Sequence, residues 1–223
     1  YYSGQVLPME EIAKASHSVG AIVGIELAHG VGNIELKLNE WGIDFGVWCT
    51  YKYLNSGPGS IAACYINEKY LKREDIQRFH GWWGNNLETR FEMENKFEQS
   101  STANVWQVSN PPILSMVPIK ASLNLIEEAG GIELLREKSI SMSKYFDYLI
   151  NEELNQDIEI ITPTQPKNRG CQLSLKVINS DFSGREVFNS LLTEGVSCDW
   201  RYPDVIRVAP VPLYNSYKEI YKF

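Results

Sequence analysis

Residues 48–59 read Trp-Cys-Thr-Tyr-Lys-Tyr-Leu-Asn-Ser-Gly-Pro-Gly, and they are the most informative segment of the sequence. The apolar run 43–49 predicts a buried strand, and the glycine- and proline-rich residues after it predict a turn. Lys52 lies between the two, flanked by tyrosines. A lysine there can lose its charge by desolvation and act as an amine nucleophile, as a Schiff base with an aldehyde cofactor requires. The alternative is a lysine that merely ends the strand at the surface.

A second polar group follows the preceding predicted strand, residues 19–27. Glu26 stands at the end of this strand, and His29 follows three residues later. Open α/β sheets bind ligands at the carboxyl ends of their strands. A carboxylate and an amine at neighbouring strand ends can address opposite edges of one planar cofactor, the carboxylate keeping a pyridine nitrogen protonated. The alternatives are a capping or salt-bridged carboxylate for Glu26 and a hydrogen-bonded core imidazole for His29.

The remaining pattern predicts two domains of an α/β protein, residues 1–130 and residues 131–223. The first contains strands separated by a helix, and the second reads as a small α+β unit. Residues 74–110 are polar and aromatic without a period, which is typical of a long functional loop. The predicted helices cover residues 8–16, 33–41, 112–129, 132–152 and 184–194. The further predicted strands cover residues 61–66, 158–161, 171–177, 196–200 and 205–209.

Composition excludes several classes of function. With 21 Lys and Arg against 28 Asp and Glu, the net charge of −7 offers no basic surface for phosphates, so nucleic acid is not an expected partner. No run approaches the roughly 20 apolar residues of a membrane span, and the start has no signal-peptide pattern, so we expect a cytoplasmic protein without a membrane partner. The four scattered cysteines predict buried free thiols, and the three histidines give no metal site.

The chain ends suggest a piece of a longer protein. The first residue is not Met, and the capping box formed by Ser216 and Glu219 opens a helix that reaches only Phe223. Short helices are marginal on their own. We therefore expect this sequence to be the C-terminal part of a longer chain.

Several segments in order resemble one family. They are E-L-A-H-G-V-G-N, D-F-G-V-W-C-T-Y-K-Y-L-N-S-G-P-G, G-W-W-G, T-R-F, S-N-P-P-I-L, R-G-C-Q-L and I-R-V-A-P-V-P-L-Y-N-S, and together they resemble kynureninase. The resemblance implies a pyridoxal 5'-phosphate (PLP) enzyme of fold type I, the aspartate aminotransferase fold. The piece would hold the second half of the large-domain sheet and a small α+β C-terminal domain, in a homodimer.

The resemblance assigns cofactor contacts to residues before the predicted loop and within it. Lys52 matches the lysine that binds the cofactor covalently, and Tyr51 matches a neighbouring tyrosine that contacts the phosphate and serves as an acid. Glu26 stands where the family carries the carboxylate for the pyridine nitrogen. His29, Trp82 and Asn110 match further cofactor contacts, the last two across the dimer interface. Taken singly, Trp82 could be a core residue and Asn110 a helix N-cap.

Substrate contacts are implied for three residues. Ser109 and Asn110 match positions near the substrate ring, and Arg207 matches the arginine that binds the α-carboxylate. Arg207 also has a physical argument of its own, because it interrupts the apolar run 205–209, where a guanidinium needs an anionic partner. The alternative is an ordinary ion pair.

Two positions depart from the family pattern. Glu26 replaces the usual Asp, which moves the carboxylate about one bond further from the backbone. Asn85, in G-W-W-G-N, stands where relatives often have His near the substrate ring. The first departure bears on activity and the second on substrate preference.

The implied reaction is hydrolysis of the Cβ–Cγ bond of L-kynurenine or 3-hydroxy-L-kynurenine, giving alanine and anthranilate or 3-hydroxyanthranilate, in tryptophan degradation and NAD synthesis. The choice between the two substrates stays open. One alternative is another fold type I enzyme such as a cysteine desulfurase, although that needs a mobile cysteine and Trp82-Trp83 favours an aryl substrate. The other is an inactive relative that serves dimerisation.

Overall fold

The computed structural model describes residues 1–179 and 181–223, which form two compact units. Residues 9–31 and 36–123 make one unit, which we call the lysine unit because it contains Lys52. Residues 1–8, 32–35 and 124–223 make the other, which we call the arginine unit because it contains Arg207. The domain boundary expected at residue 130 stays a prediction.

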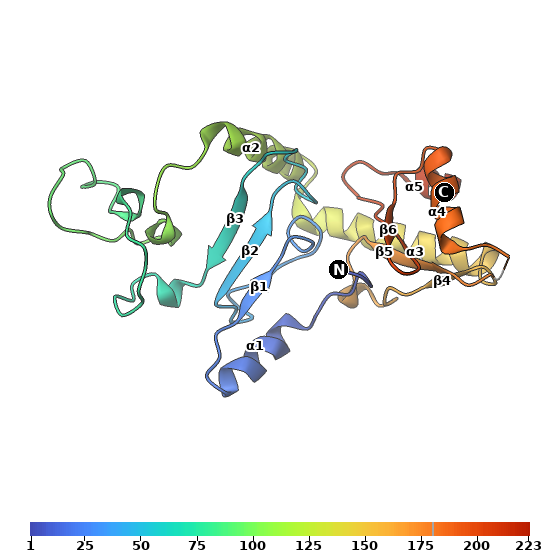
Figure 1. Ribbon diagram of the computed structural model, residues 1–223, viewed down its shortest axis with the longest axis horizontal. Helices are drawn as coiled ribbons and strands as arrows, with labels where there is room; N and C mark the ends of the chain where they lie inside the picture. The colour runs from blue at the N-terminus through green and yellow to red at the C-terminus, as the bar shows by residue number, and fades with distance from the viewer. Residues whose placement is uncertain (180) are drawn as a thin grey trace. The chain divides into compact units, whose positions relative to one another are not determined.

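The lysine unit is built on a three-stranded sheet in the order β1-β2-β3 (Figure 1). Strands β1 and β2 are parallel, whereas β2 and β3 are antiparallel. The parallel pair is the part that brings two strand ends to one edge of the sheet. The elements are α1 (Met9–Ser18), β1 (Gly24–Glu26), β2 (Phe45–Cys49), β3 (Ala62–Ile66), the 3-10 helices η1 (Glu68–Tyr70), η2 (Trp82–Gly84) and η3 (Ala103–Trp106), and the start of α2 (Ile113–Glu128).

Two predictions for this part of the chain were wrong. Residues 33–41 form turns instead of a helix, since Gly32 has a φ of 79° and residues 32–35 group with the arginine unit. The strand expected over residues 19–27 shrinks to β1, because α1 runs to Ser18 and the chain then turns at Gly20 (φ 78°). A glycine with a left-handed backbone commonly ends a helix. The residues directly after Gly20 therefore lie outside regular structure, and the strand begins only at residue 24.

Asp44, just before β2, ties the lysine unit together. Its side chain is 1% exposed and accepts hydrogen bonds from the backbone N–H of Val23 (2.6 Å) and the hydroxyl of Tyr70 (2.8 Å). His17 Nε2 and Lys69 Nζ lie 2.9 Å and 2.5 Å from its oxygens. Burial alone would raise the pKa of this carboxyl, but the hydrogen bonds, led by that of Lys69, hold the pKa well below its ordinary value. One ionised carboxylate therefore joins α1, the approach to β1, β2 and η1.

The arginine unit contains an antiparallel sheet in the order β4-β5-β7-β6. Its α4 helix begins with a capping box between Ser183 and Glu186, and the capping box predicted between Ser216 and Glu219 is present at α5. The predicted α+β pattern for this region is confirmed by the order of its elements. They are α3 (Gly131–Glu153), β4 (Ile158–Ile160), η4 (Pro166–Asn168), β5 (Leu173–Val177), α4 (Gly184–Thr193), β6 (Asp199–Arg201), β7 (Val205–Val208) and α5 (Tyr217–Lys222).

The core of the arginine unit lies between α3 and the sheet. Met142, Phe146 and Ile150 form one stripe of α3 at helical spacing and are buried against Leu173 of β5 and Ile206 of β7. This packing anchors β7, which carries Arg207, to a long and regular helix. Arg207 therefore lies on a well-supported strand.

The cysteines only partly match expectation. All four are free, and Cys171 is fully buried, but Cys64 is exposed on β3 and Cys49 and Cys198 are half-buried. Cys64 lies opposite Val47 of β2, which is itself 44% exposed, so this face of the sheet is open. Within the part of the chain that the structure describes, no helix combines the length and the apolar character needed to cross a bilayer.

Candidate functional site

The carboxyl ends of β1 and β2 meet at one edge of the sheet in the lysine unit. In the parallel register Glu26 lies opposite Val47, so β1 ends at Glu26 while β2 continues for two residues to Cys49 (Figure 1). Lys52 follows three residues after that end. The structure thus brings the predicted carboxylate and the predicted amine to the same edge, as parallel strands require.

Glu26 is oriented by its own backbone. Its Oε1 accepts a hydrogen bond from the N–H of Ala28 at 2.8 Å, and the residue is exposed. Because Ala28 engages one oxygen, the carboxylate is held at the strand end with part of its hydrogen-bonding capacity left for another donor.

His29 connects the segment after β1 with the segment after β2. Its half-buried ring makes an edge contact with Tyr53, with 6.0 Å between ring centroids and an interplanar angle of 72°. Tyr53 is the residue directly after Lys52. The imidazole therefore belongs to the same edge of the sheet as Glu26 and Lys52.

A network of hydroxyl groups fixes the turn that carries Lys52. Thr50, 1% exposed, donates through Oγ1 to the carbonyl of Ile61 at 2.6 Å and lies 2.9 Å from Ser60 Oγ. Ser56 Oγ donates to the carbonyl of Thr50 at 2.5 Å and lies 2.8 Å from Ser60 Oγ. The backbone N–H of Asn55, a residue with a φ of 55°, donates a hydrogen bond to the carbonyl of Lys52, with 2.9 Å between N and O.

These hydroxyl residues are the part of the site that sequence reasoning missed. Their signal is the spacing of Thr50, Ser56 and Ser60 around a Gly-Pro-Gly turn, where short hydroxyl side chains can replace missing backbone partners. By closing the loop on itself, they hold Lys52 on a defined turn. We regard them as groups that position the lysine.

Tyr51 is exposed, and its phenol lies near the Cys49 thiol and the Glu26 carboxylate. A hydrogen bond with the Cys49 side chain is the largest cause of its raised pKa, and the negative charge of Glu26 adds to the effect. The phenol therefore stays protonated at neutral pH. A neutral phenol at this position can donate a hydrogen bond or a proton.

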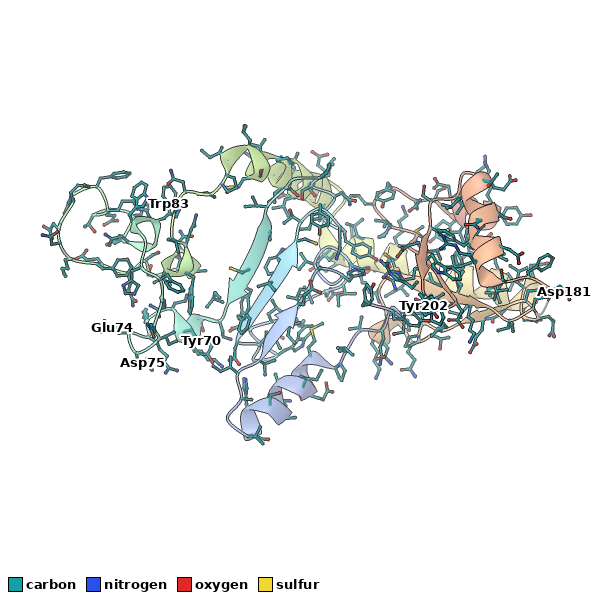
Figure 2. The ribbon with its side chains drawn as sticks, in the orientation of Figure 1. Tyr70, Glu74, Asp75, Trp83, Asp181 and Tyr202 are labelled. Carbon is teal, nitrogen blue, oxygen red and sulfur yellow. The ribbon has the colours of Figure 1, made fainter. Side chains whose placement is uncertain are left out.

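The loop over residues 74–110 gathers a second group of predicted residues. Arg90 is 6% exposed, donates to the carbonyls of Trp83 and Asn85 at 3.1 Å each, and lies 4.6 Å from the Trp83 ring centroid. Trp82, 44% exposed, contacts Trp83 and Phe91 edge-on with centroid distances of 5.3 Å and 5.5 Å. Figure 2 labels Trp83 among the side chains of this loop. A buried cation thus holds an aromatic cluster that leaves one face of Trp82 accessible.

The backbone just before Ser109 and Asn110 packs closely against the backbone at the start of η2. A Cβ on Gly81 would overlap the carbonyl oxygen of Val108, so only glycine permits this approach. Both residues are exposed, and Gln107 Nε2 donates to the Ser109 carbonyl at 3.0 Å. The structure therefore brings the segment that begins η2, and with it Trp82, near the segment of Ser109 and Asn110.

Asn85 has a role inside the loop. Its Oδ1 accepts hydrogen bonds from the backbone N–H of Asn86 (3.0 Å) and of Glu98 (2.8 Å). These bonds join the two sides of the loop beside the bridge between Asn85 and Gln99. Asn85, which stands where the family often carries His, therefore holds the two sides of the loop together through its side-chain oxygen.

Arg207 lies on β7 in the arginine unit, with a side chain only 10% exposed. Its guanidinium donates to Asp199 of the neighbouring strand, with Nε 2.8 Å from Oδ2, and to the carbonyl of Tyr1 at 3.0 Å. The expected anionic partner is therefore present within the chain itself. A carboxylate that binds the Nε–Nη2 edge of Arg207 would have to replace Asp199 there.

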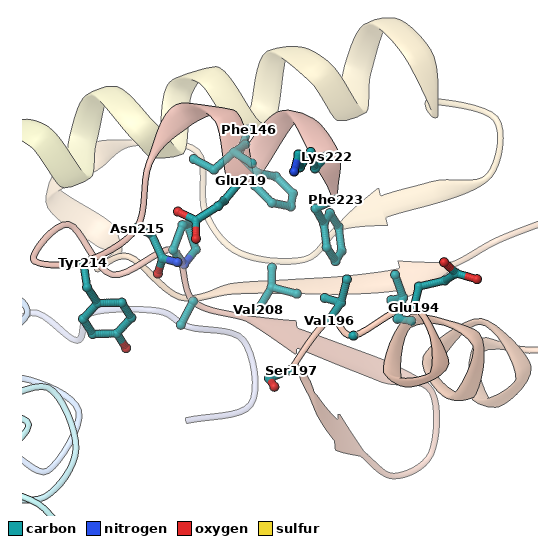
Figure 3. Close-up of a pocket in the computed structure, with 15 residues that line it drawn as sticks. Phe146, Glu194, Val196, Ser197, Val208, Tyr214, Asn215, Glu219, Lys222 and Phe223 are labelled. Atoms are coloured by element: carbon teal, nitrogen blue, oxygen red, sulfur yellow. The ribbon is translucent and has the colours of Figure 1, made fainter.

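A cleft of about 820 Å³ also opens in the arginine unit (Figure 3). Phe146, Val196, Val208 and Phe223 give it apolar walls, and Glu194 and Lys222 lie at its side. None of the residues assigned to the site from the sequence lines it. Among the described residues, His, Cys, Asp and Glu side chains do not gather in groups of three that could hold a metal ion.

Comparison with known proteins shows similarity along the whole chain. Residues 135–223 match the family described as Kynureninase C-terminal domain. The chain is 49% identical to the kynureninase of Christiangramia forsetii over 225 aligned residues and 47% identical to that of Koribacter versatilis over 223. In both cases all of this chain is covered but only 52% of the relative, so the chain spans about half the length of the curated relatives it matches. The resemblance drawn from the motifs is confirmed.

Solved structures confirm the fold. The cystine C–S lyase C-DES, in complex with cysteine persulfide, superposes with a TM-score of 0.79 at 18% identity, covering 100% of this chain and 57% of that chain. The alanine–glyoxylate aminotransferase of Nostoc sp. gives 0.67 at 15% identity, with 100% and 57% covered. A C-DES variant with glycine linked covalently to PLP gives 0.78 at 18% identity, with 100% and 56% covered. The chain has the mixed α/β architecture of fold type I PLP enzymes.

Proposed function

We propose that this chain, similar along its whole length to the C-terminal half of kynureninases, forms part of a PLP-dependent hydrolase that cleaves the Cβ–Cγ bond of L-kynurenine or 3-hydroxy-L-kynurenine. The products would be L-alanine and anthranilate or its 3-hydroxy form. One observation carries this proposal. Glu26 ends β1 and Lys52 follows the end of β2, and these two parallel, hydrogen-bonded strands bring both residues to the same edge of the sheet. Such an edge is where open α/β sheets bind their ligands.

The groups at this edge fit the cofactor by their chemistry. Lys52 offers the primary amine that an aldehyde requires, on a turn that Thr50, Ser56 and Ser60 close. Glu26 offers a carboxylate for a pyridine nitrogen, and Tyr51 offers a phenol for a phosphate oxygen. When bound, PLP supplies an electron-withdrawing ring that stabilises negative charge on substrate carbon atoms.

The protein side chains bind, orient and move protons around that ring. The Lys52 amine, once free, takes and returns protons at the substrate carbons. The Tyr51 phenol, whose pKa is raised further above neutral by the Cys49 side chain, donates a hydrogen bond beside it. Glu26, fixed by the Ala28 N–H, presents its carboxylate at the strand end.

Substrate recognition falls to the loop and to the arginine unit. We assign the aryl ring of kynurenine to the accessible face of Trp82 and to Ser109 and Asn110, with Trp82 and Asn110 serving the partner subunit of a homodimer. We assign the α-carboxylate to Arg207, whose low exposure strengthens a charge-assisted hydrogen bond. The four free cysteines are consistent with the cytoplasmic location that we propose.

The two alternatives draw less support. The likeness to cysteine desulfurases, such as that of Thermococcus onnurineus (TM-score 0.75, 17% identity), concerns the fold. An inactive relative is suggested by Glu26, which stands where the family carries Asp. However, the Glu26 side chain is held at the strand end by the Ala28 N–H, which supports a role for its carboxylate in an active enzyme.

One experiment separates the three candidates. The full-length protein is incubated with PLP and kynurenine while kynurenine loss and the appearance of anthranilate and alanine are measured. A parallel reaction contains cysteine, and released sulfide is measured. We expect turnover of kynurenine and none of cysteine. Sulfide release would support a desulfurase, and loss of neither substrate would support an inactive relative.

A further inference from the structure

Each nitrogen of the Arg207 guanidinium already has a partner, and together these partners take up three of its five N–H groups. Nε and Nη2 both point to Asp199 Oδ2, with 2.8 Å between Nε and that oxygen, and Nη1 donates to the carbonyl of Tyr1 at 3.0 Å. The Nε–Nη2 edge is one of the two edges that a carboxylate uses for bidentate binding. Asp199 therefore occupies one of the two edges of Arg207 that an incoming carboxylate could use, and the Tyr1 carbonyl takes up a donor of the other nitrogen, Nη1.

Asp199 is shared between two arginines. Arg201 Nη2 lies 2.9 Å from the same oxygen, and the guanidinium carbons of Arg201 and Arg207 lie 5.2 Å and 5.0 Å from the Tyr1 ring centroid. The side chain of Arg207 is 10% exposed, whereas those of Arg201 and Asp199 are 34% and 41% exposed. The cluster thus combines two permanent cations with one carboxylate, and the carboxylate is the more accessible partner.

We propose that Asp199 is a positioning residue that holds the Arg207 guanidinium until the α-carboxylate of the substrate takes its place, while Arg201 keeps Asp199 paired after the exchange. This inference rests on the proposed function for the identity of the ligand. It also adds a determinant of specificity, since only a ligand with a carboxylate can replace the contact that Asp199 makes.

The arrangement of charges lowers the free-energy cost of exchanging Asp199 for a substrate carboxylate on Arg207. Replacing one carboxylate by another on Arg207 leaves no cation unpaired, and Asp199 retains Arg201 and access to water. A neutral ligand, by contrast, would have to leave an almost buried guanidinium with weaker hydrogen bonds. The Asp199 carboxylate therefore competes with substrate and discriminates against neutral analogues at the same time.

The test compares Asp199→Asn with wild type in the full-length protein. Asparagine keeps the size and one acceptor but removes the competing charge. The probes are kynurenine, for kcat and KM, and 3-benzoylpropionate, which has the aryl ketone and the carboxylate but no amine, for direct binding by calorimetry. The amide of 3-benzoylpropionate is the neutral control ligand. The control variant is Asp204→Asn, since Asp204 pairs with Lys176 at 2.9 Å and is 37% exposed in the same unit.

We expect Asp199→Asn to bind 3-benzoylpropionate about threefold to tenfold more tightly and to lower KM for kynurenine by a similar factor, with a much smaller change in kcat. Binding of the amide and the behaviour of Asp204→Asn should change by less than twofold. Weaker binding of the acid, or an equal gain for the amide, would overturn the proposal. If wild type does not turn over kynurenine, the proposed function fails, whereas the binding comparison still decides the role of Asp199.

Discussion

The Glu26 carboxylate accepts a hydrogen bond from the backbone N–H of Ala28, with 2.8 Å between Oε1 and N. Aspartate side chains typically accept a hydrogen bond from the backbone N–H two residues further along the chain. Here the longer glutamate accepts the same kind of bond. The family aspartate can therefore return without loss of this anchor. We expect Glu26→Asp in the full-length protein to keep or raise kcat/KM for kynurenine.

The comparison with Glu26→Gln separates the charge of this side chain from its length. Glutamine keeps the length and an oxygen for Ala28 but removes the negative charge, so we expect a fall of at least tenfold in kcat/KM, about 1.4 kcal/mol in barrier. Steady-state kinetics on both variants measures the effect. A tenfold or larger fall in Glu26→Asp would show that the site is built around the longer side chain.

Lys52 should be indispensable for both cofactor attachment and turnover. Lys52→Ala removes the amine from the strand-end turn, so we expect the cofactor–protein adduct trapped by borohydride reduction to disappear and activity to be lost. Lys37→Ala is the control, since Lys37 is 55% exposed in the same unit and pairs only with Glu40 at 3.5 Å in the described structure. A reducible adduct that persists in Lys52→Ala would refute the assignment.

Arg207→Ala should impair substrate binding strongly. A nearly buried, charge-assisted contact contributes about 2–4 kcal/mol, so we expect kcat/KM to fall about 30-fold to 1,000-fold. The control is Arg185→Ala, because Arg185 lies over the rings of Phe188 and Trp200 in the same unit. An unchanged kcat/KM in Arg207→Ala would mean that another group binds the carboxylate.

Asp44 should make the stability of the protein depend on acid pH. Its folded-state pKa lies below the unfolded value of about 4, so its contribution is fully present above pH 4 and is lost as pH falls below it. We expect Asp44→Asn to lower the free energy of unfolding by at least about 2 kcal/mol at pH 7. The difference from wild type should shrink as pH decreases below 4.

Urea unfolding at several pH values measures this effect. Asp75→Asn serves as control, because Asp75 forms an exposed ion pair with Arg73 and should change the unfolding curve little at any pH. A difference between wild type and Asp44→Asn that stays constant down to pH 3 would show that the charge of Asp44 is not what stabilises the unit.

Local signals predicted the strand-end chemistry and the long helices. The apolar run before Lys52 and the turn after it gave β2 and its loop, and the Gly130-Gly131 pair gave the break between α2 and α3. Such features depend on neighbours in sequence, so they can be read without knowing the tertiary structure. The edge shared by Glu26 and Lys52 then followed from the geometry of parallel strands.

Features that depend on pairing between distant segments could not be predicted in the same way. The antiparallel direction of β3 leaves no mark in its apolar pattern, and the turns at residues 33–41 follow from Gly32 and from contacts such as that of Asn33 Oδ1 with Cys171 N at 2.9 Å. The partner of Arg207 is set by the register of β6 on β7, which places Asp199 opposite it. Sequence alone supplied the need for an anion but not its source.

The 223-residue chain expressed by itself should not form a working site. Among the described strands, β1 and β3 each pair with β2 alone, and Phe45 and Val47 are 41% and 44% exposed on the open face of this sheet. Unpaired edges beside exposed apolar groups favour association. The chain also spans only 52% of the length of its curated kynureninase relatives, and a site without several charge-assisted bonds to the cofactor phosphate binds it more weakly by orders of magnitude. We expect light scattering to report aggregates and a PLP titration, followed by absorbance, to show no stoichiometric binding and no kynurenine loss, with the full-length protein as control. Tight one-to-one binding with turnover by the 223-residue chain would contradict this expectation.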